Sequence, residues 1–206
     1  MAPAGGKGKD ASANGGIRLR ILESAKGLFA KKGFAATSIR EIAQSAKVTN
    51  PMIYYYFGSK EELFMAVLGQ AMETFDTLFE ALLEADIPYE EKLVELFMMH
   101  FESVVQDPDL SRLFVYTFFG PDRDRLGLAV EDFGQNDCFK GLIEQGVELG
   151  VLRSDEQDVQ QLHLEGLVHM PVMKLMAGEP IELDRQVAHR LVKLFLDGAG
   201  ARQEGS

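Results

Sequence analysis

The sequence contains a single cysteine, Cys138, among its 206 residues. An internal disulfide and a cysteine metal cluster are therefore both impossible, which is typical of proteins that work in a reducing compartment. No uninterrupted apolar run approaches the roughly 18 residues that a membrane helix needs. The N-terminal segment also lacks the apolar core of a secretory signal. These absences predict a cytoplasmic protein with no membrane partner.

Signatures of catalysis are missing as well. No glycine-rich phosphate loop appears, and Cys138 has no paired base in a recognisable nucleophile motif. His163 and His169 belong to one expected helix. Their six-residue spacing does not place them on one face of it, whereas residues at i and i+4 do share a face. The sequence therefore predicts no catalytic residue, no cofactor and no metal site.

Strand-type alternation is absent, and apolar residues instead recur at helical spacing from Ile17 onward. Glycine and proline punctuate this pattern into three short helices followed by about six more. The first helix is expected over 17–32 and a later one over 124–149. Another is expected over 154–177, with a kink at Pro171. The predicted fold class is all-α, with about nine helices.

The overall net charge of −11 conceals a strong asymmetry. Residues 1–60 contain ten Lys or Arg and three acids, for a net charge of +7, so the remainder carries −18. This charge distribution is typical of a protein whose basic end binds a polyanion and whose acidic end is repelled by it. The alternative is that the acidic part is simply a soluble surface. The expected segments are a disordered tail at 1–15, a three-helix DNA-binding domain at 16–60, a larger helical domain at 61–200 and a tail at 201–206.

The most informative stretch is TSIREIAQSAKVTNPMIYYYFGSK, residues 37–60. Its first part repeats apolar residues at i, i+3, i+4 and i+7, which predicts a helix with one buried face. Thr49 and Asn50 then stand where a second helix begins, and Pro51 suits its first turn. This second helix is too short to be stable alone and leaves polar and aromatic side chains outside. These features are typical of a recognition helix in a DNA major groove.

Two kinds of DNA contact are expected from this stretch. Asn50 can pair with adenine through two hydrogen bonds, and Met52 can meet a thymine methyl group. Tyrosine hydroxyls and helix N-termini can bind phosphates, which position the helix without reading sequence. The alternative is that the polar residues are only helix caps. The predicted DNA-binding residues are Thr37, Ser38, Arg40, Thr49, Asn50, Pro51, Met52, Tyr54, Tyr55 and Lys60.

Residues 17–67 resemble the TetR family of bacterial transcriptional regulators. The resemblance rests on an amphipathic helix ending in KKGF, then TSIREIA, then V-T-x-x-x-I-Y-Y-Y-F, then SKEELF, in that order and spacing. It implies a helix-turn-helix domain followed by a larger helical domain that binds a small molecule and forms a dimer. One departure is Lys47, where the family usually carries Gly. If the turn needs a left-handed residue there, Lys costs about 1 kcal/mol more than Gly.

Many phenylalanine and methionine side chains occupy the second half of the chain. As a group they indicate an apolar pocket that accepts aromatic ligands, although each of them alone could be ordinary core. Between 63 and 119 the only basic residues are Lys92 and Arg112, so an anion would lack partners there. His100, His163 and His169 could add a polar handle. The predicted ligand-binding residues are Phe75, Phe79, Met98, Phe101, Phe114, Phe118, Met170 and Met173.

The last two expected helices have wide apolar faces. The resemblance implies that the equivalent helices form a four-helix dimer interface, although the same pattern could pack the core of one chain. The predicted dimerisation residues are Leu162, Gly166, Leu167, Val187, Leu191, Leu194 and Phe195.

Together these observations predict a sequence-specific DNA-binding regulator, a homodimeric repressor released from a palindromic operator by a small lipophilic effector. The expected partners are a double-stranded DNA operator, this effector and a second copy of the chain. Two alternatives within the family are an activator and a regulator that senses a partner protein. Two alternatives from other classes are a helical enzyme and a non-specific DNA-architectural protein.

Overall fold

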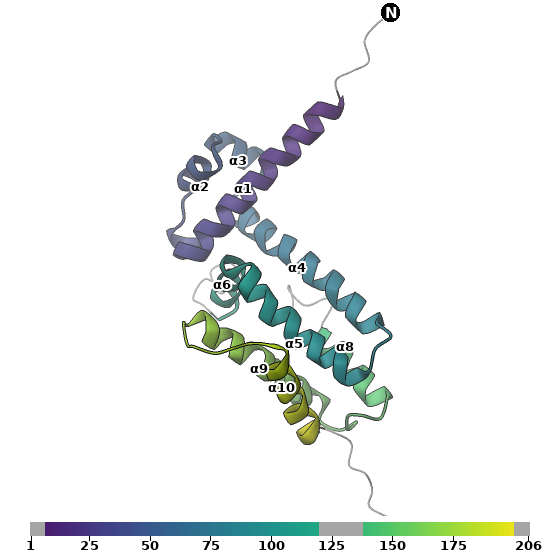
Figure 1. The fold of residues 1–206 in the computed structure, drawn as a ribbon. Coiled ribbons are helices and arrows are strands. Elements are labelled where there is room, and N and C mark those ends of the chain that lie inside the picture. Colours follow the sequence, from purple (N-terminus) through teal and green to yellow (C-terminus); the bar gives the residue numbers. More distant parts are fainter. Residues whose placement is uncertain (1–6, 120–137, 200–206) are drawn as a thin grey trace, which may run out of the picture. The chain divides into compact units, whose positions relative to one another are not determined.

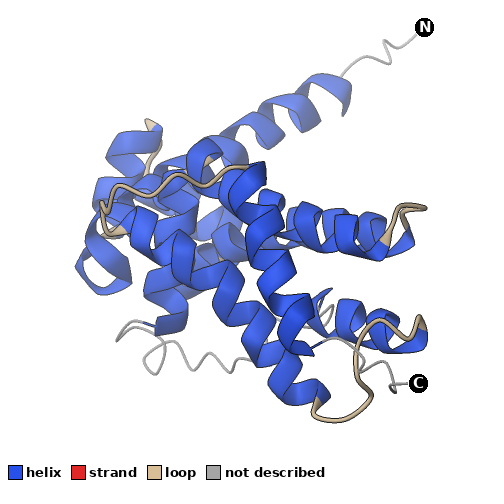
Figure 2. Ribbon diagram, turned by 60° about the horizontal axis from the view of Figure 1, so that its bottom comes forward, coloured by secondary structure: helices blue, strands red, loops and turns tan. Residues whose placement is uncertain are grey.

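The computed structural model describes residues 7–119 and 138–199. Nine helices lie in these ranges and no strand does, which confirms the predicted all-α fold (Figures 1 and 2). The helices are α1 (Lys7–Ala36), α2 (Ile39–Ala46), α3 (Asn50–Phe57), α4 (Lys60–Glu84), α5 (Tyr89–Gln106), α6 (Pro108–Phe119), α8 (Cys138–Glu148), α9 (Gln157–Met176) and α10 (Arg185–Ala199).

The chain divides into two compact units. The first comprises the described parts of 1–72 and 109–129, and the second comprises those of 73–108 and 130–206. The division between the two compact units falls within α4, after Met72, and α6 belongs to the first unit from Asp109 onward. The functional boundary expected after residue 60 stays a prediction.

The first unit is held together by the apolar face of α1. Ile21 and Phe29 have no exposed surface, and the same is true of Ile42 from α2 and Ile53 from α3. The ring of Phe64 from α4 packs edge-on against Phe29, with the two centroids 5.0 Å apart. This core fixes α2 and α3, each only eight residues long, which could not be stable helices alone.

Helix α1 differs from the prediction at its N-terminus. It begins at Lys7, ahead of the expected start at residue 17, so residues 7–15 are helical rather than disordered. Extending a helix that packing has already nucleated costs far less than starting one, which explains the longer helix. The predicted stop at Gly33 is a break in the helical backbone, with φ 78° and ψ 166°, inside the range Lys7–Ala36.

The second unit is built on α5, which packs against α9 and α10, while α8 packs against α9 (Figure 1). Its core combines side chains of all four helices. Residues without any exposed surface are Leu93, Val94, Leu96 and Phe97 from α5, Leu142 from α8, Leu164 and Val168 from α9, and Ala188, Val192 and Phe195 from α10.

Two polar side chains from the first turns of α5 are also buried in this unit. The hydroxyl of Tyr89 donates to the carbonyl of Leu142 at 2.8 Å. The ammonium group of Lys92 donates to the carbonyl of Leu83 at 2.7 Å and to Oε1 of Gln145 at 3.0 Å. A cation at this position also suits the negative end of α4. Both groups therefore satisfy their hydrogen bonds while joining α5 to its neighbours.

Two further helix predictions concern α8 and α9. Of the helix expected over 124–149, the described part is α8, because residues 120–137 lie outside the described ranges. Pro171 lies inside α9, which runs as one element from Gln157 to Met176, and the kink expected there stays a prediction. None of the described helices is both long enough and apolar enough to cross a membrane.

Candidate nucleic-acid interface and associated sites

The turn between α2 and α3 is closed by two backbone hydrogen bonds. The amide of Lys47 donates to the carbonyl of Gln44 at 3.3 Å, and that of Val48 donates to the carbonyl of Ala43 at 3.0 Å. This is the Schellman pattern, which needs a left-handed residue just after the helix. Lys47 is that residue, with φ 54° and ψ 48°. The turn thus keeps a left-handed geometry despite the presence of a β-carbon.

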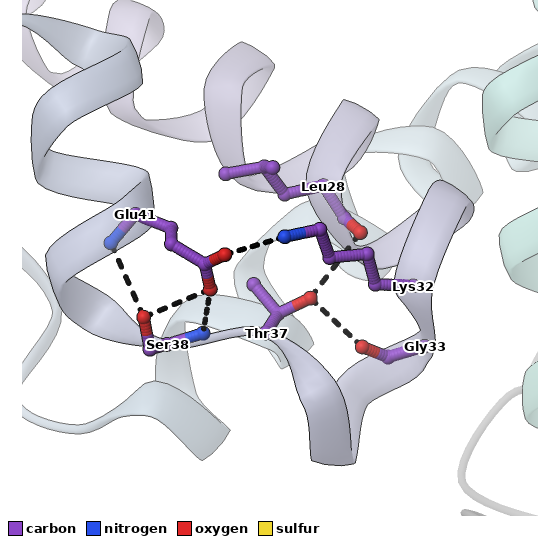
Figure 3. A network of polar contacts seen from close by, with 6 residues as sticks. All are labelled: Leu28, Lys32, Gly33, Thr37, Ser38 and Glu41. Atoms are coloured by element: carbon purple, nitrogen blue, oxygen red, sulfur yellow. Dashed lines mark hydrogen bonds and ion pairs between the residues drawn. The ribbon is translucent and has the colours of Figure 1, made fainter.

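The N-terminus of α2 is closed by a capping box (Figure 3). The hydroxyl of Ser38 accepts from the amide of Glu41 at 3.3 Å, and the Glu41 carboxylate accepts from the amide of Ser38 at 3.0 Å. Lys32 forms an ion pair with the same carboxylate. The hydrogen bonds to Lys32 and Ser38 lower the pKa of Glu41 to about 2. A carboxylate of the protein itself therefore occupies the anion site that the sequence suggested for phosphate.

Thr37 has a structural position that corrects its predicted role in DNA contact. Its side chain is buried, and its hydroxyl donates to the carbonyls of Gly33 at 2.8 Å and Leu28 at 3.2 Å (Figure 3). These bonds tie the last turns of α1 to the start of α2. Arg40, by contrast, is exposed on the first turn of α2.

Helix α3 has a buried and an exposed face. Ile53 and Phe57 point into the first unit, with 0% and 6% of their surfaces exposed. Tyr54 and Tyr55 project outward, with 51% and 78% exposed. Thr49 precedes the helix, and its side chain makes no capping hydrogen bond. A role as helix cap therefore does not explain the threonine at this position. Thr49, Asn50 and Pro51 are exposed, and Met52 is half-buried.

Two cations pack on aromatic rings beside α3. The ammonium group of Lys60 lies 4.2 Å from the centroid of the Phe34 ring, and the guanidinium carbon of Arg18 lies 5.3 Å from that of Phe57. Each contact orients a positive group through the electrostatics of the ring face. The sequence identified Lys60 but missed Arg18. Its position on α1, far from the 37–60 stretch, gave no local signal.

The predicted ligand-binding residues fall into three groups. Phe75, Phe79, Met98 and Met173 are half-buried in the second unit. Phe101 is core, because only 1% of its surface is exposed, whereas 54% of Met170 is exposed. The roles of Phe101 and Met170 in ligand binding stay predictions. Phe114 belongs to the first unit, and the side chain of Phe118 lies outside the described residues.

Two histidines that the sequence did not pair meet among the half-buried phenylalanines. The ring of His100 on α5 lies 5.5 Å from that of His169 on α9, between centroids. The Phe79 ring stacks on His100 at 5.8 Å, and Phe139 of α8 contacts both imidazoles at 5.7 and 5.4 Å. Phe75 completes the group at 6.0 Å from His100. We call these five side chains the imidazole cluster. Their spacing along the chain gave no hint of it, since they come from four helices.

The imidazole cluster is polar but uncharged at neutral pH. Burial lowers the pKa of His100 to about 4, although the hydrogen bond to Leu96 acts in the opposite direction; repulsion from a protonated His169 would lower it further. Burial also lowers the pKa of His169. His163, which the sequence placed beside His169, instead contacts the Phe195 ring at 5.6 Å. The described residues contain no group of three or more His, Cys, Asp or Glu that could hold a metal ion.

The predicted dimerisation residues lie at different depths. Leu162 and Leu194 have 69% and 62% of their surfaces exposed, and Gly166 is exposed as well. Leu167, Val187 and Leu191 are half-buried against the core of the second unit. Phe195 has no exposed surface, so it is part of that core and its assignment to a dimer surface is corrected. Val159 and Met170 extend the exposed apolar face of α9.

Comparisons with known proteins agree with this geometry. Residues 21–67 match the family model described as bacterial regulatory proteins, tetR family. The repressor KstR2 of Mycolicibacterium smegmatis is 33% identical over 189 residues, which cover 88% of this chain and 89% of that protein. This chain belongs to the TetR family. It is a DNA-binding transcriptional regulator, and its relatives are named as regulators rather than enzymes.

Another relative matches part of the sequence of this chain, and a solved structure shares its fold. The repressor NicS of Pseudomonas putida is 40% identical over 93 residues, or 45% of this chain and 43% of that protein. The structure of FadR from Bacillus subtilis in complex with stearoyl-CoA superposes with a TM-score of 0.74 at 19% identity, covering 87% and 98% of the two chains. At that identity the likeness concerns the fold alone.

Proposed function

We propose that this TetR-family protein is a homodimeric repressor that leaves a palindromic operator when a small lipophilic effector binds. The observation that carries the DNA-binding half of the proposal is the outward face of α3. Its buried residues anchor the helix in the first unit, while Thr49, Asn50, Tyr54 and Tyr55 remain on the surface. A helix presented in this way can enter a major groove with its polar residues foremost.

The residues of this face have distinct roles in the proposal. Asn50 pairs with an adenine edge, and Thr49 and Met52 contact neighbouring bases. Tyr54 and Tyr55 donate their hydroxyls to phosphates and so fix the position of the helix. In the proposal Ser38, Pro51, Arg40 and Lys60 also contact DNA, and the two basic residues among them add contacts that do not depend on sequence.

An exposed apolar face on α9 supports the proposed dimer. Val159, Leu162, Gly166 and Met170 follow one another at three- and four-residue spacing, so they share one side of the helix. Among the described residues, no side chain and no atom of another segment lies within 4 Å of the position where a β-carbon of Gly166 would stand. Contiguous apolar surface of this kind marks a protein contact. A second copy of α9 and α10 would bury it.

A lipophilic effector is supported by the second unit and by the relatives. The half-buried Phe and Met side chains offer apolar surface, and one relative of the same fold binds stearoyl-CoA. Another structural relative is described as a ketosteroid transcriptional regulator. An effector can release DNA only through its different affinities for the two states of the dimer.

Selection of bound DNA from a random pool tests the proposal. We expect a palindromic site whose half-site centres lie about 34–36 Å apart or at a multiple of this distance. Asn50→Ala should relax base preference at one position in each half-site, at a cost of roughly 1–3 kcal/mol. Lys60→Ala is the contrasting variant, because loss of a phosphate contact weakens all sequences about equally and reduces the salt dependence. An unchanged base preference in Asn50→Ala would contradict the placement of the recognition helix.

A further inference from the structure

The proton positions in the imidazole cluster follow from one hydrogen bond. Nδ1 of His100 lies 2.8 Å from the carbonyl oxygen of Leu96, one turn earlier on α5. A carbonyl oxygen only accepts, so Nδ1 carries the proton. Because burial keeps the ring neutral at pH 7, Nε2 of His100 is then unprotonated and acts as a hydrogen-bond acceptor. The cluster thus presents an acceptor of fixed identity among three phenyl rings.

His169 complements this acceptor. The structure records ring contacts of His169 with His100 and Phe139, and none of the hydrogen bonds described for residues 7–119 and 138–199 fixes its tautomer. A neutral His169 can therefore present either a donor or an acceptor nitrogen toward a bound molecule. Burial is the main cause of the lowered pKa of both imidazoles, so a polar ligand group that meets them is shielded from water as well.

Positive charge is absent from the surroundings of the cluster, as far as the described side chains show. Lys92 of α5 donates to Leu83 and Gln145, and Lys140 of α8 is exposed beside Glu144. Lys174 of α9 is exposed and pairs with Glu179. An anionic ligand group at the cluster would lose its hydration without gaining a cation, which is costly.

We propose that the imidazole cluster recognises the hydroxyl group of an uncharged, ring-containing effector, which donates to Nε2 of His100 and accepts from His169. This inference rests on the proposed effector function and names the chemical class of the effector. The phenyl rings of Phe75, Phe79 and Phe139 supply the apolar and stacking surface for the ring system.

A hydroxyl fits the two imidazoles better than other polar groups, because it carries both a hydrogen-bond donor and an acceptor. A ketone or an ether has only acceptors, so it leaves Nε2 of His100 without a partner. A carboxylate also has only acceptors and needs a proton on the pair before it can bind well. A hydroxyl both donates and accepts, which matches two neutral imidazoles. A site whose buried polar atoms need the hydroxyl rejects an analogue that lacks it.

A matched set of three probes tests the proposal: 2-naphthol, its methyl ether 2-methoxynaphthalene, and 2-naphthoate. Titration calorimetry of the full chain at pH 7.5 should give an affinity for 2-naphthol about tenfold higher than for the ether, as expected for one lost buried hydrogen bond. His100→Phe keeps a ring against Phe79 and should reduce this preference to about twofold or less. His169→Phe is a second variant and should also reduce it.

His163→Phe is the control, because it makes the same substitution on α9 outside the cluster and should preserve the tenfold preference. Equal affinities of wild-type protein for the naphthol and the ether, or no binding of the naphthol, would overturn the proposal. So would tighter binding of 2-naphthoate that strengthens as the pH falls, since the pair would then be an anion site that takes up a proton.

Operator release, measured in parallel by fluorescence anisotropy, separates this inference from the proposed function. Hydroxyl-selective binding that depends on His100 but leaves operator affinity unchanged would support the cluster as a binding site and contradict the effector-release function. Release of DNA by compounds that show no hydroxyl preference and no dependence on His100 would contradict the cluster alone.

Discussion

Replacing Lys47 by glycine should stabilise this regulator. Lys47 occupies the left-handed region with φ 54° and ψ 48°, where its β-carbon approaches a backbone carbonyl. That conformation costs an L-residue about 1–2 kcal/mol. Glycine escapes this cost but loses about 0.5–1 kcal/mol through its greater freedom in the unfolded chain. The net expectation for Lys47→Gly is a gain of about 1 kcal/mol in the free energy of unfolding.

Thermal unfolding at fixed protein concentration measures this gain. For a chain of this size, 1 kcal/mol raises the melting temperature by about 2–4 °C. Lys47→Ala is the matched control, because it removes the same exposed, charged side chain but keeps the β-carbon. Its stability should stay within about 0.5 kcal/mol of the wild type. Loss of the lysine charge affects both variants equally, so only the difference between them reports backbone strain.

Equal stability of the glycine and alanine variants would contradict backbone strain at Lys47. A second left-handed residue provides an independent comparison, since Glu156 has φ 58° just before α9. Glu156→Gly should also be more stable than Glu156→Ala. If only the pair at Lys47 differed, the left-handed backbone would not be the general cause.

Three further outcomes are expected. Leu194→Glu should shift a wild-type dimer toward monomer in light scattering while the chain stays folded, because the leucine is 62% exposed in the single chain and a dimer would bury the new charge. Phe195→Ala should instead destabilise the fold by about 3–5 kcal/mol, since it empties a fully buried site. A wild-type protein that is a monomer at micromolar concentration would contradict the proposed dimer interface. Glu41→Gln should reduce stability at pH 7. Because folding lowers the pKa of Glu41 from 4.5 to about 2, its contribution is present above pH 4.5 and disappears as the pH falls toward 2. The difference between wild type and variant should therefore shrink over that range in chemical unfolding experiments, and a constant difference would exclude the charge of Glu41 as its source.

Local sequence signals determined much of this protein. The buried face of α2 and the start of α3 near Thr49 both depend on residues within a few positions of one another. Helical periodicity, caps and turn chemistry act over that range, so the sequence alone predicts them. The order of these local signals also led to the family that the full-length comparison established.

The tertiary structure decided what depends on distant partners. A threonine just before a helix is typical of an anion-binding position. In the structure, however, Thr37 packs against α1, and its buried hydroxyl donates hydrogen bonds to two carbonyls there. An apolar stripe does not say which member turns inward, and contact with α5 and α9 made Phe195 core while Leu194 stayed exposed. His100 and His169 are 69 residues apart in the sequence and meet only because α5 and α9 pack together. Helix packing brings together side chains that no local pattern links, and the imidazole cluster arises from that packing.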